Sequence, residues 1–165
     1  MTTNTAVTIR PAVPADSAAL GKLGSILMGM HHNFDPQRFI APEPGTEYGY
    51  GAFLKSQLTE PDVIVLVAEQ EGEVIGYAYA AIEGWDYMAL RGPAGVLHDI
   101  VVDPGQRGQG IGRMLLDAAL TAIKTRGAPR VVLSTANKNE AAQRLFAEAG
   151  FRRTMIEMTR ELEDR

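Results

Sequence analysis

Residues 96–112 read Val-Leu-His-Asp-Ile-Val-Val-Asp-Pro-Gly-Gln-Arg-Gly-Gln-Gly-Ile-Gly, and the other predicted elements are arranged around this stretch. It begins as an apolar run with an ionisable insertion after Leu97, breaks at residues 103–105, and leads into a helical pattern from Met114. The order predicts a strand, a glycine-rich turn and a helix. Glycines let backbone N–H groups approach a ligand, and the amino terminus of a helix favours an anion. The loop is therefore predicted to hold a phosphate group.

Two common phosphate-binding loops do not fit this spacing. A Walker-type loop requires Gly-Lys-Ser/Thr at the start of the helix, whereas Ile111 and Arg113 follow the last two glycines here. A dinucleotide-binding fingerprint requires a third glycine three residues after the second, and Leu115 occupies that position. The chain therefore needs a different explanation for its glycines.

The remaining pattern is Arg107-x-x-Gly110-x-Gly112 after an apolar strand and an Asp-Pro break. It resembles the acyl-CoA-binding signature of the GNAT acetyltransferase superfamily. A second segment resembles the family's second motif, in which a helix and the next strand complete the cofactor cleft. That segment reads Asn139-x-x-Ala142-x-x-Leu145-Phe146, followed by Gly150-Phe151. The two motifs stand in the family's order and separation.

The resemblance implies acetyl-CoA as cosubstrate and assigns residues to its parts. The backbone of Ile100, Val101 and Val102 pairs with the pantetheine arm, and Asn139 and Phe146 border the same arm. The pyrophosphate is held by the loop residues, which are Arg107, Gly108, Gln109, Gly110, Ile111, Gly112 and Arg113.

Two of these residues also have a simpler interpretation. Taken alone, Arg107 is a solvated loop charge. Asn139 is either a cofactor contact or only a helix cap, and Asn137 with Glu140 three residues later makes the better capping box. The sequence leaves both questions open.

Composition limits the class of protein. A chain of 165 residues fits one domain over 1–165 that buries roughly 70% of its unfolded surface. It has no cysteine, no amino-terminal leader pattern and no apolar run near the ~18 residues of a membrane span, so a cytoplasmic location is expected. A net charge of −4 without a basic block argues against nucleic-acid and membrane partners.

The remaining patterns predict a single α/β domain with a mixed sheet of six to seven strands and about four helices. Residues 31–39 are expected to form a loop, with no metal site at His31 or His32. Strands are predicted at residues 7–10, 63–68, 74–82, 96–102, 131–135 and 151–162. Helices are predicted from Asp16 or Ser17 through Met30, and at residues 48–58, 111–126 and 140–149.

His98 is the first candidate for a catalytic base. Strict strand alternation puts His98 on the side of Ile100 and Val102, and Asp99 on the side of Leu97 and Val101. Histidine titrates near neutrality, which suits proton relay, and arylalkylamine acetyltransferases resemble this chain in placing a relay histidine there. The alternative is that His98 is a core histidine whose hydrogen bonds are made within the protein. Glu83 and Glu157, the latter on the predicted last strand, are the reserve bases.

The chemistry makes a base more useful than an acid. Deprotonating an amine with a pKa near 10 at neutral pH costs about 4 kcal/mol, whereas releasing a thiolate costs about 2 kcal/mol. Many family members carry a tyrosine as general acid where this chain has Phe146. Either another hydroxyl, such as Ser134 or a pocket tyrosine, replaces it or the thiolate leaves unaided.

The expected activity is therefore N-acetylation by direct attack of a bound amine on acetyl-CoA in a ternary complex. The alternatives are a non-catalytic acyl-CoA-binding module and an acetyltransferase of protein amino groups. The acceptor is expected to be a small-molecule or peptide amine that enters between residues 31–50 and 83–93. A carboxy-terminal strand at a sheet edge leaves the chain a monomer or a homodimer.

Overall fold

The computed structural model describes residues 5–162. Residues 1–4, most of the stretch searched for a leader, and residues 163–165 of the predicted domain lie outside it. The helices are α1 (Ser17–Phe34), α2 (Thr46–Gln57), α3 (Ile111–Thr125) and α4 (Glu140–Glu148), with short 3-10 turns at Pro14–Asp16 and Pro104–Gln106. The strands are β1 (Thr8–Pro11), β2 (Val63–Gln70), β3 (Glu73–Glu83), β4 (Ala94–Val102) and β5 (Val131–Leu133).

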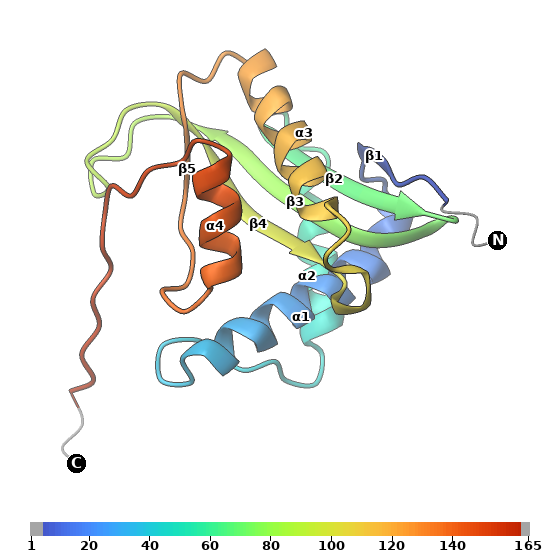
Figure 1. Ribbon diagram of the computed structural model, residues 1–165, viewed down its shortest axis with the longest axis horizontal. Coiled ribbons are helices and arrows are strands. Elements are labelled where there is room, and N and C mark those ends of the chain that lie inside the picture. The colour runs from blue at the N-terminus through green and yellow to red at the C-terminus, as the bar shows by residue number, and fades with distance from the viewer. Residues whose placement is uncertain (1–4, 163–165) are drawn as a thin grey trace.

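The strands form one sheet in the order β1-β2-β3-β4-β5, antiparallel up to β4 and parallel between β4 and β5. Helices α3 and α4 cover one face, and α1 and α2 cover the other (Figure 1). Along β2, Ile64 and Ala68 enter the core under α3, while Val65 and Val67 enter the core under α1. A strand buried on both faces reads as a continuous apolar run, which is the pattern seen in its sequence.

A β-bulge in β4 changes which face His98 occupies. Tyr79 of β3 lies opposite Asp99, and the next residue, Ala80, lies opposite Leu97, so His98 is the extra residue. The expected strict alternation is therefore wrong. Leu97 packs in the core under α3 with Ile100, whereas His98 stacks on Tyr79, whose ring packs against the other core.

Helix α1 is longer than predicted, because it includes residues 31–34 of the expected loop. His31 Nδ1 donates to the Leu27 carbonyl at 2.8 Å, one turn back along the helix. The Asp35 N–H then donates to the His31 carbonyl at 3.1 Å and closes the last turn. These bonds place both histidines on the helix that borders the candidate site.

The sheet has five strands, so the predicted six to seven were too many. Residues 151–162 form no strand, although their sequence alternates as a strand does. Figure 1 shows the segment leaving the end of α4 and running away from the sheet. A strand forms only where a neighbouring backbone supplies its hydrogen bonds, and no strand of the described chain lies against this segment.

Asp16 joins the start of α1 to the first strands. Its carboxylate accepts two bonds from the Arg10 guanidinium, at 2.8 and 3.0 Å, and one from the Val13 N–H at 2.8 Å. The guanidinium holds the pKa of this carboxyl below its ordinary 3.8, and the Val13 N–H lowers it further. Asp16 precedes α1 as its cap residue, but its side chain makes these contacts and no capping bond to α1.

Asp16→Asn is expected to lower the free energy of unfolding at pH 7 by about 1–3 kcal/mol, because a charge-assisted pair is lost. A carboxyl with a lowered folded pKa stabilises the fold above its unfolded pKa, and this contribution is lost as pH falls through the folded value. Urea unfolding at pH 7 and pH 3 should therefore show a smaller acid-dependent loss in the variant than in the wild type. An equal loss would contradict this role for Asp16.

Candidate active site

The glycine-rich loop joins β4 to α3. Asp103 starts it by accepting from the Gly105 N–H at 2.8 Å. Gly108 and Gly110 have φ of 80° and 78°, the left-handed region that glycine enters without strain. Gly110 precedes α3 and provides no side-chain cap, so the first N–H groups of the helix have no acceptor within the helix. This arrangement suits an anion.

The side chains of the loop have distinct contacts. Arg107 is exposed, with Nη2 at 3.2 Å from Met30 Sδ. Gln109 donates to Gln106 at 3.1 Å, and Arg113 pairs with Asp117 at 2.9 Å. Ile111 is 2% exposed, and its side chain anchors the end of the loop in the core under α3. A Cβ at Gly108 or Gly110 would meet nothing within 4 Å, so there is open space beside the loop.

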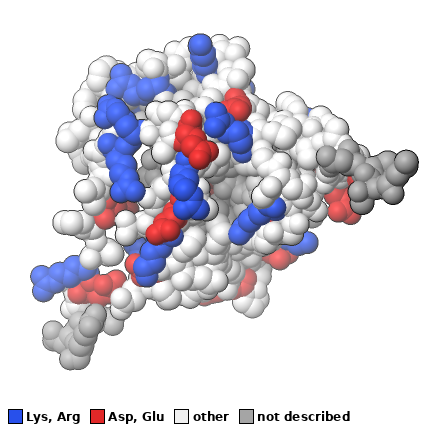
Figure 2. Space-filling model, viewed as in Figure 1, with Lys and Arg blue, Asp and Glu red and all other residues white. Residues whose placement is uncertain are grey.

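The surface around the loop carries charges of both signs. Figure 2 shows Lys and Arg side chains spread over the face that carries α3 and α4, several of them beside acidic side chains. This face is therefore not a continuous basic surface of the kind that binds a nucleic-acid backbone. The loop and the helix end are therefore the features of this surface that suit an anion.

Strands β4 and β5 separate before the loop is reached. Their pairing runs only from Gly95 with Val131 to Leu97 with Leu133, although β4 continues to Val102. Beyond Leu97 the backbone of β4 does not pair with β5, and this is the stretch, including Ile100, where the sequence prediction puts the pantetheine arm. The gap opens a cavity of about 260 Å³, whose lining includes His98, Ile100, Ser134, Asn139 and Phe146.

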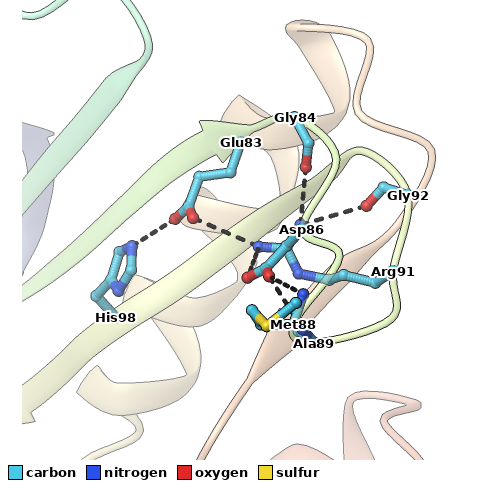
Figure 3. Close-up of polar contacts among 8 residues, drawn as sticks. All are labelled: Glu83, Gly84, Asp86, Met88, Ala89, Arg91, Gly92 and His98. Carbon is cyan, nitrogen blue, oxygen red and sulfur yellow. Dashed lines mark hydrogen bonds and ion pairs between the residues drawn. The ribbon is translucent and has the colours of Figure 1, made fainter.

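His98 lines this cavity and forms a polar pair with Glu83, which lies outside the lining. Nε2 of His98 lies 2.8 Å from Oε2 of Glu83, and the two side chains are 40% and 37% exposed. Figure 3 shows the histidine on β4 pointing toward the carboxylate at the end of β3. The His98 ring also stacks on Tyr79, with centroids 5.2 Å apart. A histidine placed in this way is accessible to a substrate and is not buried in the core.

Arg91 fixes the loop that follows Glu83 at the end of β3. Its Nη1 donates to the carbonyls of Gly84 and Gly92 at 3.1 and 3.2 Å, and its Nη2 lies 3.4 Å from Glu83 Oε1 (Figure 3). Asp86 and Arg91 also pair through their backbones and close the loop. One side of an open cavity of about 580 Å³ carries the exposed rings of Trp85 and Tyr87.

A buried network on the other side of His98 was not predicted. The hydroxyls of Tyr50 and Tyr77 both donate to Asp99 Oδ2, at 2.6 and 2.8 Å. Burial raises the pKa of both tyrosines, and the nearby Asp99 carboxylate raises it further. The hydroxyl of Tyr79 donates to Gln57 at 3.2 Å. All three hydroxyls already donate to protein acceptors, so none is free to donate to a leaving thiolate in this arrangement.

A model of the acetyltransferase (GNAT) family matches residues 28–151, which include β4, the glycine-rich loop and α4. The chain belongs to the GNAT acetyltransferase family. This confirms the predicted family and fold class, and with them the acetyl-CoA cosubstrate that GNAT enzymes use.

Among its relatives is an uncharacterized N-acetyltransferase of Bacillus subtilis, YhfO, 29% identical over 145 residues, which cover 87% of this chain and 88% of that one. A mycothiol acetyltransferase of Thermobispora bispora is 35% identical over 96 residues. That match covers 56% of this chain but 31% of the relative, so the chain spans less than a third of its length.

Solved structures share the GNAT fold at low identity. A mutant of the BH1408 protein of Bacillus halodurans superimposes with a TM-score of 0.81 at 20% identity, covering 94% of this chain and 99% of that one. The aminoglycoside N-acetyltransferase AAC(6')-Iy in complex with CoA has a TM-score of 0.74 at 20% identity, covering 98% and 99%. At this identity the likeness supports the fold alone.

Asn139 of the second GNAT motif both caps α4 and lines the cavity. Its Oδ1 accepts from the Ala142 N–H at 3.2 Å, so the expected capping box of Asn137 and Glu140 is wrong. Capping orients the Asn139 side chain at the cavity wall. Its two interpretations are therefore compatible.

The structure does not bring Glu157, the other reserve base, to His98. Glu157 lies on the exposed carboxy-terminal segment, where its carboxylate pairs with Arg38. This guanidinium lowers the pKa of Glu157, mainly through the hydrogen bond. Glu83 is thus the predicted reserve that contacts His98. Among residues 5–162, no cluster of His, Asp and Glu is suited to a metal, and no helix is long and apolar enough to span a membrane.

Phe146, in the usual place of the GNAT tyrosine, is 6% exposed and packs edge-on against Phe151. If the thiolate leaves unaided, Phe146→Tyr should change the turnover number little or raise it modestly. Phe146→Leu should weaken acetyl-CoA binding several-fold and cost about 1–2 kcal/mol of stability, because ring contacts are lost. Single-turnover rates at saturating acetyl-CoA separate binding from chemistry. Loss of the chemical step in Phe146→Leu would contradict this assignment.

Proposed function

We propose that this GNAT protein transfers the acetyl group of acetyl-CoA to a primary amine by direct attack within a ternary complex. One observation carries the proposal: a single strand, β4, presents His98, paired with Glu83 of β3, at the cavity and then ends in the glycine-rich loop. The strand thus fixes the distance between a candidate base and a phosphate-binding loop.

The described residues fit the binding of acetyl-CoA that the proposal requires. The loop from Arg107 to Arg113 would hold the pyrophosphate through backbone N–H groups and the amino terminus of α3. The backbone of Ile100, Val101 and Val102, on the part of β4 beyond its pairing with β5, would hold the pantetheine arm. Acetyl-CoA supplies the activated acetyl thioester.

In the proposed proton transfer, each ring nitrogen of His98 has its own role. Because an ionised carboxylate only accepts hydrogen bonds, Glu83 keeps the ring proton on Nε2. Nδ1 is then the nitrogen that takes the amine proton, directly or through a water. The carboxylate also stabilises the imidazolium that forms, which lowers the ~4 kcal/mol cost of deprotonating the amine. A backbone N–H of β4 would stabilise the developing oxyanion.

The leaving group needs less help from the protein. Release of a thiolate costs about 2 kcal/mol at neutral pH, and the nearby tyrosine hydroxyls already donate to Asp99 and Gln57. Ser134 lines the cavity and is the remaining hydroxyl from the sequence prediction. Thiolate departure without a tyrosine acid is therefore part of the proposal.

The amine would enter beside Glu83 through the open cavity. The acidic Glu83 and the exposed rings of Trp85 and Tyr87 border it and favour a cationic amine with an apolar or aromatic part. This acceptor is either a small molecule or the amino group of a peptide.

A panel of amines tests the proposal. Arylalkylamines, polyamines, amino acids, aminoglycosides and peptides are incubated with acetyl-CoA, and free thiol is measured against enzyme-free reactions. At least one cationic amine should release thiol in proportion to enzyme concentration. Tight acetyl-CoA binding without release by any amine would instead favour a non-catalytic acyl-CoA-binding module.

A further inference from the structure

The bulge in β4 brings two consecutive ionisable side chains to the same side of the sheet. In a regular strand, His98 and Asp99 would point to opposite faces. Here His98 stacks on Tyr79, and Asp99 accepts a hydrogen bond from Tyr77, two residues earlier on β3. Both tyrosine rings pack with the core under α1. The candidate base and a carboxylate therefore line the same cavity.

One oxygen of Asp99 is engaged and the other is open. Oδ2 accepts from the hydroxyls of Tyr50 and Tyr77, at 2.6 and 2.8 Å. No group within residues 5–162 donates to Oδ1, and no side-chain oxygen of that part of the chain is both buried and unpaired. Oδ1 is therefore accessible, and a ligand in the cavity that Asp99 lines can reach it.

The packing of α1 on α2 fixes this carboxylate in place. Tyr50 of α2 lies directly over Gly24 of α1, where an added Cβ would stand 2.3 Å from the Tyr50 ring. Tyr77, the second donor to Asp99, is 0% exposed. Two hydroxyls from different elements hold Oδ2, so the carboxylate is ordered before a ligand binds.

The charges at the cavity favour a cation. Asp99 is the acid among the lining residues of the described chain, and these residues include no Lys or Arg. His31, Tyr50 and His98 are the other titratable groups of the lining. Glu83 adds a second carboxylate just outside the lining, where it contacts His98. A cationic group is attracted here, whereas an anionic group meets carboxylates without a Lys or Arg to offset them.

We propose that Asp99 Oδ1 binds the ammonium group of the acceptor, and that this contact restricts the acceptor to amines without a carboxylate beside the reacting nitrogen. This inference rests on the acetyl transfer proposed above. A primary ammonium has three N–H groups, so one can donate to Asp99 while another gives its proton to Nδ1 of His98. The expected acceptors are therefore simple amines and amino groups next to a neutral amide, but not free α-amino acids.

The exclusion follows from the short distance between the two ends of an α-amino acid. With the ammonium on Asp99 Oδ1, the carboxylate on the adjacent carbon would be held close to the carboxylate of Asp99. Like charges at this separation repel strongly in a partly buried site. A neutral amide on the same carbon has similar size but no charge, so it separates repulsion from crowding.

A series of acceptors tests this restriction. Tyramine, tyrosinamide and tyrosine carry hydrogen, a neutral amide or a carboxylate beside the same nitrogen, and agmatine, argininamide and arginine form a second set. In the wild type, kcat/KM should be about 100-fold or more lower for each amino acid than for its amide. In Asp99→Asn, this ratio should shrink by about tenfold or more, because the repelling charge is gone. Equal use of amide and amino acid by the wild type, or an unchanged ratio in the variant, would overturn the proposal.

The Michaelis constant tests the contact with whichever amine of the panel is acetylated fastest. Asp99→Asn should raise KM for the amine by about tenfold or more and change kcat by less than about threefold, because a charge-assisted contact is lost. The asparagine carbonyl still accepts from Tyr50 and Tyr77, so the urea midpoint and the affinity for acetyl-CoA should be kept. Asp62→Asn, at an exposed position between α2 and β2, makes the same change in net charge and should keep the wild-type KM.

The outcomes distinguish the contact from the transfer itself. Acetylated amine with an unchanged KM in Asp99→Asn would remove Asp99 as the ammonium site and leave acetyl transfer standing. Loss of kcat at an unchanged KM would mean that Asp99 takes part in the chemical step, which also overturns the binding role. Absence of turnover with every amine would instead refute acetyl transfer, and the ammonium site with it.

Discussion

Replacing His98 by alanine is expected to lower kcat/KM for acetyl transfer by about 10²–10³, the usual contribution of a positioned general base. His98 is 40% exposed at the cavity and 2.8 Å from Glu83, so the pair can reach a bound amine and hold its proton. Because the base must be unprotonated, wild-type kcat/KM should rise with pH to a plateau. The residual rate of the variant should continue to rise at higher pH, where the amine loses its proton without help.

Binding of acetyl-CoA is the control for His98→Ala. The pantetheine arm is proposed to lie on the backbone of β4, so the affinity measured by calorimetry should be unchanged. Glu83→Gln keeps the hydrogen bond but removes the charge, and it should lower the rate less than His98→Ala. A near-normal rate for His98→Ala at pH 7 would remove His98 from the mechanism and leave Glu83 as the base.

Replacing Gly110 by valine is expected to weaken acetyl-CoA binding by tenfold or more, about 1.4 kcal/mol. Gly110 has φ of 78°, which a β-branched residue strongly disfavours, and it immediately precedes α3. The added side chain would also occupy the open space in which the pyrophosphate is proposed to lie. Calorimetric titration of the folded variant measures the loss.

Gly127→Val separates ligand binding from backbone strain. Gly127 has φ of 83°, and a Cβ there also meets nothing within 4 Å, but it lies beyond the opposite end of α3. Both variants should therefore lose similar stability, and only Gly110→Val should lose affinity. Equal affinities in the two variants would argue against the loop as the pyrophosphate site.

Local signals predicted the central part of the fold, including the glycine-rich loop that we propose as the pyrophosphate site. The apolar run of β4, the glycines after Asp103 and the helical face of α3 depend on neighbouring residues alone, and their boundaries agree within a few residues. The Phe146 position was likewise found by motif spacing. Short-range patterns of this kind follow from backbone sterics and residue periodicity, so the elements that they predict are also present in the folded chain.

Features that depend on long-range pairing were missed. The bulge at His98 arises from the register between β3 and β4, which alternation along one strand does not reveal. Asp99 within an apolar strand was a signal for a polar network. One of its partners, however, is Tyr50 of α2, which is distant from Asp99 in the sequence. Residues 151–162 have the pattern of a strand, but none of the strands within residues 5–162 pairs with them.

The most direct test of direct acetyl transfer follows both products and the protein in one reaction. Wild-type protein, acetyl-CoA and the best amine of the panel are mixed, and free thiol, N-acetylated amine and intact protein mass are measured together. Equal amounts of thiol and acetylated amine, with the protein mass unchanged, are predicted. An acetyl group on the protein itself, or bound acetyl-CoA that yields no acetylated amine, would contradict the account.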